Sequence, residues 1–132
     1  MSPTKPAVTF PAWRTHDNFV PLIEVLLAVG PWTFGQVSWT VGGSAFGTGW
    51  RGSAELARLA ENGRRVPTRI LVDLVSDGVQ LVDGEASCFR DSAQEPFLVL
   101  ASVRGDSWDV HSTEQTVLDS VRRCFDDVAE LR

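Results

Sequence analysis

Residues 97–112 read FLVLASVRGDSWDVHS, and this stretch predicts two antiparallel strands joined by a tight turn. Its first part, FLVLASV, is apolar and rich in β-branched side chains, and its last part, WDVHS, has the composition of a second short strand. The residues between them, RGDS, include the Gly and Asp that turns favour. A hairpin at this position indicates an antiparallel sheet.

A similar pattern precedes this hairpin over residues 69–89. RILVDLV and VQLVDGEASCF both have strand composition, and the SDG between them is a hairpin signal. We therefore expect an antiparallel meander of four strands that ends at Ser112. In this interpretation Asp73 lies on an apolar face of its strand, where a carboxylate needs a partner such as Arg69.

Helices are expected both before and after this meander in the sequence. A first helix is predicted over residues 17–30, where a Gly-Pro pair ends it, and a short one over residues 53–62, which Ser53 can cap. Between them, WTFGQVSWTV (residues 32–41) predicts a strand and GGSAFGTGW (residues 42–50) a short return strand. The last helix begins at a capping-box spacing and keeps one apolar stripe as far as Leu131.

These elements predict an α+β fold, with an antiparallel β-meander sheet, helices packed on one face and a long amphipathic C-terminal helix. The 132 residues divide into an extended N-terminal arm at residues 1–16 and a single α+β domain at residues 17–132. No apolar run is long enough to cross a bilayer and the N-terminus lacks a secretory signal, so we expect a cytoplasmic protein with no membrane contact. Cys88 and Cys124 are expected to be buried, reduced thiols.

The net charge of −5 is unevenly distributed along the chain. Residues 1–69 have seven basic and four acidic side chains, a net charge of +3, whereas residues 70–132 have five basic and thirteen acidic ones, a net charge of −8. Nucleic-acid binding needs a surplus of Lys and Arg to displace counterions, so we do not expect it here. The acidic half predicts either a merely solubilising surface or a face that binds a basic protein partner.

Our leading hypothesis is a non-catalytic protein-binding domain whose acidic face binds a basic partner; a homodimer is compatible with it. Immunity proteins that neutralise toxins and chaperone-like secretion factors share this small, acidic α+β plan, which is an analogy of architecture alone. Trp50 and Arg51 are predicted as contact anchors, and Trp13 as a further exposed ring. The residues predicted to steer the partner by charge are Asp109, Glu114, Asp119, Asp126, Asp127 and Glu130.

GTGWRG, residues 47–52, matches G-x-G-x-x-G and precedes a predicted helix. No parallel strand leads into its first Gly, and a hairpin rather than a crossover is expected after it, so we predict neither a dinucleotide site nor another cofactor. In the Gly-rich loop and helix N-terminus around Gly47–Ser53, the backbone N–H groups of Arg51, Gly52 and Ser53 can still bind an anion. The alternative function is therefore a small-molecule-binding domain or enzyme, with Arg51, Arg64 and Arg65 as anion contacts.

We predict no catalytic residue and no metal site. Asp109 and His111 share one face of a strand, because side chains two positions apart point the same way. Cys88 would join them as a nucleophile only if the fold places it beside them, which the sequence does not determine. The tryptophans assigned to the core are Trp32, Trp39 and Trp108.

Overall fold

The computed structural model describes residues 6–46, 52–76 and 81–131. These residues form nine strands and four α-helices, with a 3₁₀ helix, η1, after the first α-helix. In chain order the elements are β1 (Ala7–Pro11), β2 (Trp13–Thr15), β3 (Asn18–Phe19), α1 (Leu22–Ala28), η1 (Pro31–Thr33), β4 (Val37–Phe46), α2 (Gly52–Asn62), β5 (Val66–Pro67), α3 (Thr68–Val75), β6 (Leu81–Arg90), β7 (Leu98–Val103), β8 (Ser107–Ser112), α4 (Gln115–Cys124) and β9 (Ala129–Glu130).

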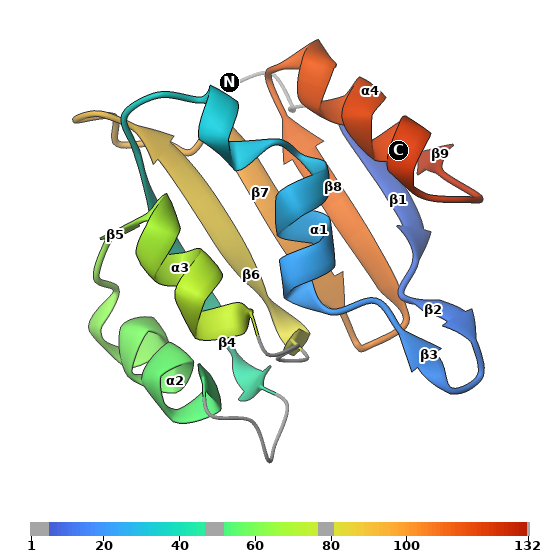
Figure 1. Cartoon of the computed structure of the whole chain (residues 1–132), viewed down its shortest axis with the longest axis horizontal. Helices are drawn as coiled ribbons and strands as arrows, with labels where there is room; N and C mark the ends of the chain where they lie inside the picture. The colour runs from blue at the N-terminus through green and yellow to red at the C-terminus, as the bar shows by residue number, and fades with distance from the viewer. Residues whose placement is uncertain (1–5, 47–51, 77–80, 132) are drawn as a thin grey trace.

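Seven strands form one sheet in the order β5-β4-β6-β7-β8-β1-β9, and each neighbouring pair is antiparallel. The other two, β2 and β3, form a separate small hairpin. Figure 1 shows α1, α3 and α4 lying over one face of the large sheet, with α2 beside β4. The prediction of an α+β fold, with helices on one face of an antiparallel sheet, is confirmed.

The hairpin predicted for residues 97–112 is confirmed. β7 and β8 pair from Leu98 opposite Ser112 to Val103 opposite Ser107, and the side chains of β8 alternate between half-buried and buried. Gly105 lies in the turn with a φ of 71°, a left-handed conformation that glycine adopts without strain. Because side chains alternate between the two faces of a strand, the buried set points to the helices.

Two indole rings occupy the core between the sheet and the helices. Trp39 and Trp108 are fully buried, as expected. The Nε1–H of Trp39 donates to Thr68 Oγ1 at 3.0 Å, and that of Trp108 donates to the Val20 carbonyl oxygen at 2.9 Å. These bonds allow both large rings to be buried without leaving an unpaired donor.

The opposite face of the sheet has no helix packed on it in the described part of the chain (Figure 1). There the strand register aligns side chains in two rows across β4, β6, β7, β8 and β1, and we call these rows the open face. One row contains Thr40, Ser87, Val99, His111 and Ala7, and the other contains Gly42, Glu85, Ala101, Asp109 and Thr9. Neither row contains Lys or Arg.

The strand predicted at RILVDLV is wrong, because these residues belong to helix α3. Its buried side chains are Thr68, Leu71 and Val75, and these spacings of three and four positions follow the period of a helix. A short apolar run fits both a buried strand and a helix, and here α3 packs against α1 and β4. Asp73 is exposed to solvent on α3, so its carboxylate does not need the partner that burial in a strand would have required.

The segment from Gly30 to Phe46 also differs from the prediction. Gly30 has a φ of 68° and directs the chain into η1, where Trp32 is 62% exposed instead of buried. Within the described residues 42–46, the return strand predicted after Gly42 does not form. β4 continues to Phe46, because β6 offers it hydrogen-bonding partners along that length.

The long C-terminal helix is not observed, since α4 ends at Cys124. Phe125 has an extended backbone (φ −127°, ψ 152°) and Asp127 a left-handed one (φ 56°), so the chain leaves the helix before it forms β9. Phe125 and Val128 still pack against the core, which explains why the apolar stripe extends past the helix. Cys124 is exposed, contrary to expectation, whereas Cys88 is buried.

The first helix begins later than predicted, at Leu22, because residues 18–19 form β3 and pair with β2. β1 is part of the large sheet, where it pairs with β8 on one side and with the two-residue β9 on the other. The helix predicted at residues 53–62 is confirmed as α2. None of the helices within the described ranges has the length and hydrophobicity that a bilayer crossing requires.

Candidate functional site

Two of the predicted charged residues, Asp126 and Asp127, line a cavity of about 160 Å³ next to the C-terminal end of α4. Its walls come from the end of β1, the β2–β3 hairpin and the segment that follows α4. The lining residues are Phe10, Pro11, Trp13, Arg14, Val20, Cys124, Phe125, Asp126 and Asp127. Three aromatic rings and two carboxylates therefore meet in one place, which we call the aromatic cavity.

Ring contacts fix the walls of the aromatic cavity. Phe10 and Phe125 stack with their centroids 4.2 Å apart and their planes 11° from parallel. Trp13 meets Phe19 edge to face at 5.0 Å, and its Nε1–H donates to the Gly105 carbonyl oxygen at 2.7 Å. Trp13 is 41% exposed, so these contacts hold its ring in place while part of it remains open to a partner.

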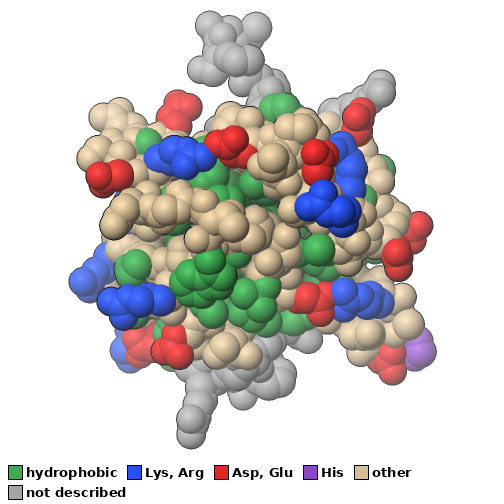
Figure 2. Space-filling view, turned by 45° about the horizontal axis from the view of Figure 1, so that its top comes forward, with side chains coloured by type: hydrophobic (Ala, Val, Ile, Leu, Met, Phe, Trp, Pro, Cys, Tyr) green, Lys and Arg blue, Asp and Glu red, His purple; other side chains and the backbone are tan. Residues whose placement is uncertain are grey.

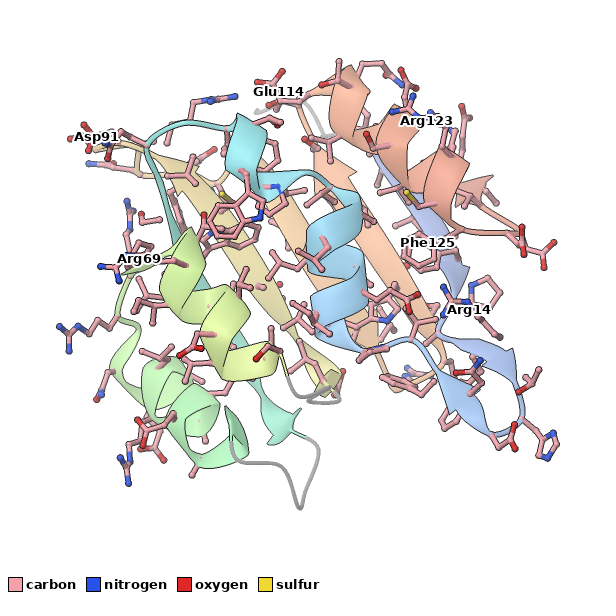
Figure 3. The ribbon with its side chains drawn as sticks, viewed as in Figure 1. Arg14, Arg69, Asp91, Glu114, Arg123 and Phe125 are labelled. Atoms are coloured by element: carbon pink, nitrogen blue, oxygen red, sulfur yellow. The ribbon has the colours of Figure 1, made fainter. Side chains whose placement is uncertain are left out.

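One cation already lies beside the cavity. The Arg14 guanidinium pairs with Glu24, and its central carbon lies 5.8 Å from the centroid of the Phe125 ring. Figure 3 shows Arg14 and Phe125 next to each other near the end of α4. The hydrogen bond to Glu24 raises the pKa of Arg14, partial burial opposes this effect, and the charges of Glu24 and Asp126 add to it. Arg14 therefore stays protonated at the cavity wall.

The cavity nevertheless has an excess of negative charge. Asp126 and Asp127 are both exposed, and no ion pair joins Asp127 to another described residue. Together with Arg14 and Glu24 they give a local net charge of −2 at neutral pH. This arrangement can attract a further cation to a surface that is otherwise aromatic.

The acidic residues predicted along α4 are paired within the chain. Glu114 pairs with Arg90, and Asp119 pairs with Arg122 at 3.3 Å. Arg122 also lies 4.0 Å from Glu130. Figure 2 shows acidic and basic side chains interspersed on the side of the molecule that it displays. The six predicted steering residues thus do not form one continuous surface.

The structure does not bring Cys88 next to Asp109 and His111. Cys88 faces the core opposite Trp39 and is fully buried, while Asp109 and His111 lie on the open face, so the sheet separates them. Burial raises the pKa of the Cys88 thiol to about 12, and the nearby charge of Arg90 lowers it. A neutral, buried thiol that the sheet separates from Asp109 and His111 is not an activated nucleophile.

The two predicted anchors, Trp50 and Arg51, lie outside the described residues, as does most of the predicted anion-binding loop. α2 begins at Gly52, close to where a helix was expected. Of the other predicted anion contacts, Arg65 stacks over the Phe89 ring at 4.0 Å and donates to the Ala93 carbonyl oxygen at 2.8 Å. Its guanidinium is thus bound within the chain.

A second exposed aromatic site was not predicted. Trp32 lines a groove of about 220 Å³ together with Pro67 and Arg69, and Leu27 is half exposed on α1. The signal for Trp32 was its position directly after Gly30-Pro31, where the chain turns at the end of a helix. Phe125 was predicted only as part of a helical stripe, and its role in the aromatic cavity follows from the early end of α4.

Within the described ranges, no three His, Cys, Asp or Glu side chains cluster in a way that suits a metal ion. Comparisons of this chain with family models, with curated proteins and with solved structures find no match.

Proposed function

We propose that this chain is a non-catalytic protein-binding domain that receives a basic side chain of its partner in the aromatic cavity. The observation that supports this most is the position of Asp126 and Asp127 beside the stacked rings of Phe10 and Phe125. Aromatic faces attract cations and pack against the apolar stem of Arg or Lys, while carboxylates bind its charged end. The same walls thus suit both parts of such a side chain.

The size of the cavity favours a protein side chain over a metabolite. Its volume of about 160 Å³ lies below the range of roughly 300–1,000 Å³ that small-molecule pockets occupy. Arg14 gives an internal example of the proposed contact, because its guanidinium already lies near Phe125 and within the influence of Asp126. A partner Arg or Lys would add a second cation to a site with a net charge of −2.

The partner in this proposal is a protein with a basic surface. Immunity proteins and secretion chaperones, whose architecture served as the analogy, likewise bind a protein partner. The proposal places the domain in the cytoplasm, because an exposed thiol such as Cys124 remains reduced there without a disulfide partner. Electrostatic attraction to the two aspartates would accelerate association more than it would slow dissociation.

A titration of the ¹⁵N-labelled protein with N-acetyl-arginine amide tests the proposal. We expect shifts in the amide signals of residues 125–127 and in the indole signal of Trp13, with a dissociation constant on the order of millimolar for one isolated side chain. The Asp126→Asn and Asp127→Asn double variant should lose this binding, because it removes both carboxylate charges with little change in shape.

Asp119→Asn is the matched control, since Asp119 belongs to α4 but is paired with Arg122 outside the cavity. It should leave the titration unchanged. Equal shifts with N-acetyl-glutamate amide, or arginine binding that survives in the double variant, would contradict the proposal.

A further inference from the structure

We infer that the open face is a second docking surface, which binds a basic amphipathic segment of a protein partner. This surface lies on the other side of the sheet from the helices and does not include the aromatic cavity (Figure 1). A result that contradicts the proposed function therefore does not contradict this inference, and the reverse also holds.

A poorly compensated charge lies in the middle of the open face. The Oδ1 atom of Asp109 is shielded from solvent and has no hydrogen-bond partner among the described residues. Burying part of a carboxylate without a donor is unfavourable, and a cation that docks over it reduces that cost. Thr9 and Ala101 flank Asp109 on the neighbouring strands, and neither is a cation.

A second carboxylate lies in the same row. Glu85 is exposed on β6, and its Oε1 lies 3.9 Å from the point where a Cβ on Gly42 would be. Since Gly42 has no side chain, Glu85 can rest along the sheet surface. β7 separates the strands of Glu85 and Asp109, so their backbones are about 10 Å apart, twice the spacing of neighbouring strands.

An apolar stripe runs between the two carboxylates. It consists of the outward side chains of β7, which are Val99, Ala101 and Val103. Val103 is 37% exposed, and two serines, Ser87 and Ser107, lie opposite the stripe on the neighbouring strands. A matching partner therefore presents small apolar side chains with Arg or Lys on both sides of them.

Charge complementarity selects a basic partner over a second copy of this chain. The ionisable side chains of the two rows are Glu85, Asp109 and His111, with no Lys or Arg. Two copies packed through this face would bring two pairs of carboxylates together, and like charges at a desolvated interface oppose association. A basic segment instead places its cations over both carboxylates.

The probe for this inference is a short synthetic peptide in which valine and alanine are flanked by arginine, added to the ¹⁵N-labelled protein. We expect shifts in the amide signals of β6, β7 and β8. Asp109→Asn should weaken binding on the order of tenfold, as expected for one charge-assisted hydrogen bond. Ala101→Arg, which places a cation on the stripe, should abolish it, and the dispersion of the amide spectrum shows whether each variant is folded.

The titration is repeated in the Asp126→Asn and Asp127→Asn double variant, in which the aromatic cavity no longer binds arginine, and the shifts of β6–β8 should persist there. Asp119→Asn, whose carboxylate pairs with Arg122, is the matched control and should leave peptide affinity unchanged. The inference is overturned if the shifts avoid β6–β8, or if a peptide with glutamate in place of arginine binds equally well. It is also overturned if sedimentation shows a dimer of the unliganded protein that Ala101→Arg dissociates, because a second copy would then occupy the face.

Discussion

The ring of Phe125, which follows α4, stacks on the ring of Phe10 in β1 at a centroid distance of 4.2 Å. This contact attaches the segment after the last helix to a strand near the start of the described chain. The same pair forms one wall of the aromatic cavity. Stability of the domain and shape of the site therefore depend on one pair of rings.

Replacement of Phe125 should affect both properties. Phe125→Ala removes the stack and half-buried apolar surface, and we expect the free energy of unfolding to fall by about 2 kcal/mol in urea denaturation. Phe125→Leu keeps an apolar side chain and should lose about 1 kcal/mol, most of it from the ring contact. Both variants should bind N-acetyl-arginine amide more weakly; unchanged stability in Phe125→Ala would show that the stack contributes little.

The left-handed backbone at Asp127 predicts a specific order of substitutions. Its φ of 56° suits Gly and Asn but not a β-branched residue. We expect Asp127→Asn and Asp127→Gly to leave the unfolding midpoint nearly unchanged, and Asp127→Val to lower stability by about 1–2 kcal/mol. Thermal unfolding of the three variants checks this order, and an equally stable Asp127→Val would contradict it.

The hydrogen bond from Trp39 to Thr68 should be important for stability. Thr68→Val keeps the shape of the side chain but leaves the buried indole N–H unpaired, which should cost about 1–3 kcal/mol. Thr68→Ser retains the hydroxyl and is the matched control, expected to lose less. Urea unfolding followed by tryptophan fluorescence measures the difference between the two variants.

The two cysteines should react very differently. Cys124 is exposed and Cys88 is fully buried, so a thiol reagent at pH 8 should modify Cys124 rapidly and Cys88 only when the protein unfolds. Mass spectrometry of the labelled protein identifies the site. Rapid labelling of Cys88 in the native protein would show that β6 opens readily.

Cys88 should also make stability depend on pH in the alkaline range. Burial raises the pKa of its thiol to about 12, whereas the thiol of an unfolded chain titrates near 8.5. Its stabilising contribution is thus complete below pH ~8.5 and is lost as pH rises toward 12, by about 1.4 kcal/mol per pH unit. Cys88→Ala should lack this contribution, and parallel pH profiles for the two proteins would contradict the assignment.

Local sequence pattern was sufficient for the β7–β8 hairpin but not for α3. In the hairpin, a turn with Gly105 separates two strand-like runs, and both runs pair along their length. In α3, Leu71 and Val75 satisfy the helical period, but Ile70 and Leu74 beside them give the run the apolar composition of a strand. The packing of α3 on α1, α2 and β4 distinguishes the two structures.

In the candidate site, too, the sequence predicted some features and missed others. Asp126 and Asp127 were predicted from charge. The aromatic cavity beside them, however, forms because α4 ends at Cys124 and because β1 pairs with β8 in the large sheet. Contacts between residues so distant in sequence leave no local signal. Trp32 illustrates the opposite error, because a large aromatic residue was assigned to the core although its turn places it in solvent.

The position of β1 has a consequence for synthesis. Val8 and Phe10 become buried only after β8 has been translated, because β1 pairs with β8 and β9 and with no strand closer in sequence. While the nascent chain grows on the ribosome, this apolar segment has not yet paired with a neighbouring strand. Completion of the sheet is thus delayed until β8 and β9 have emerged from the exit tunnel.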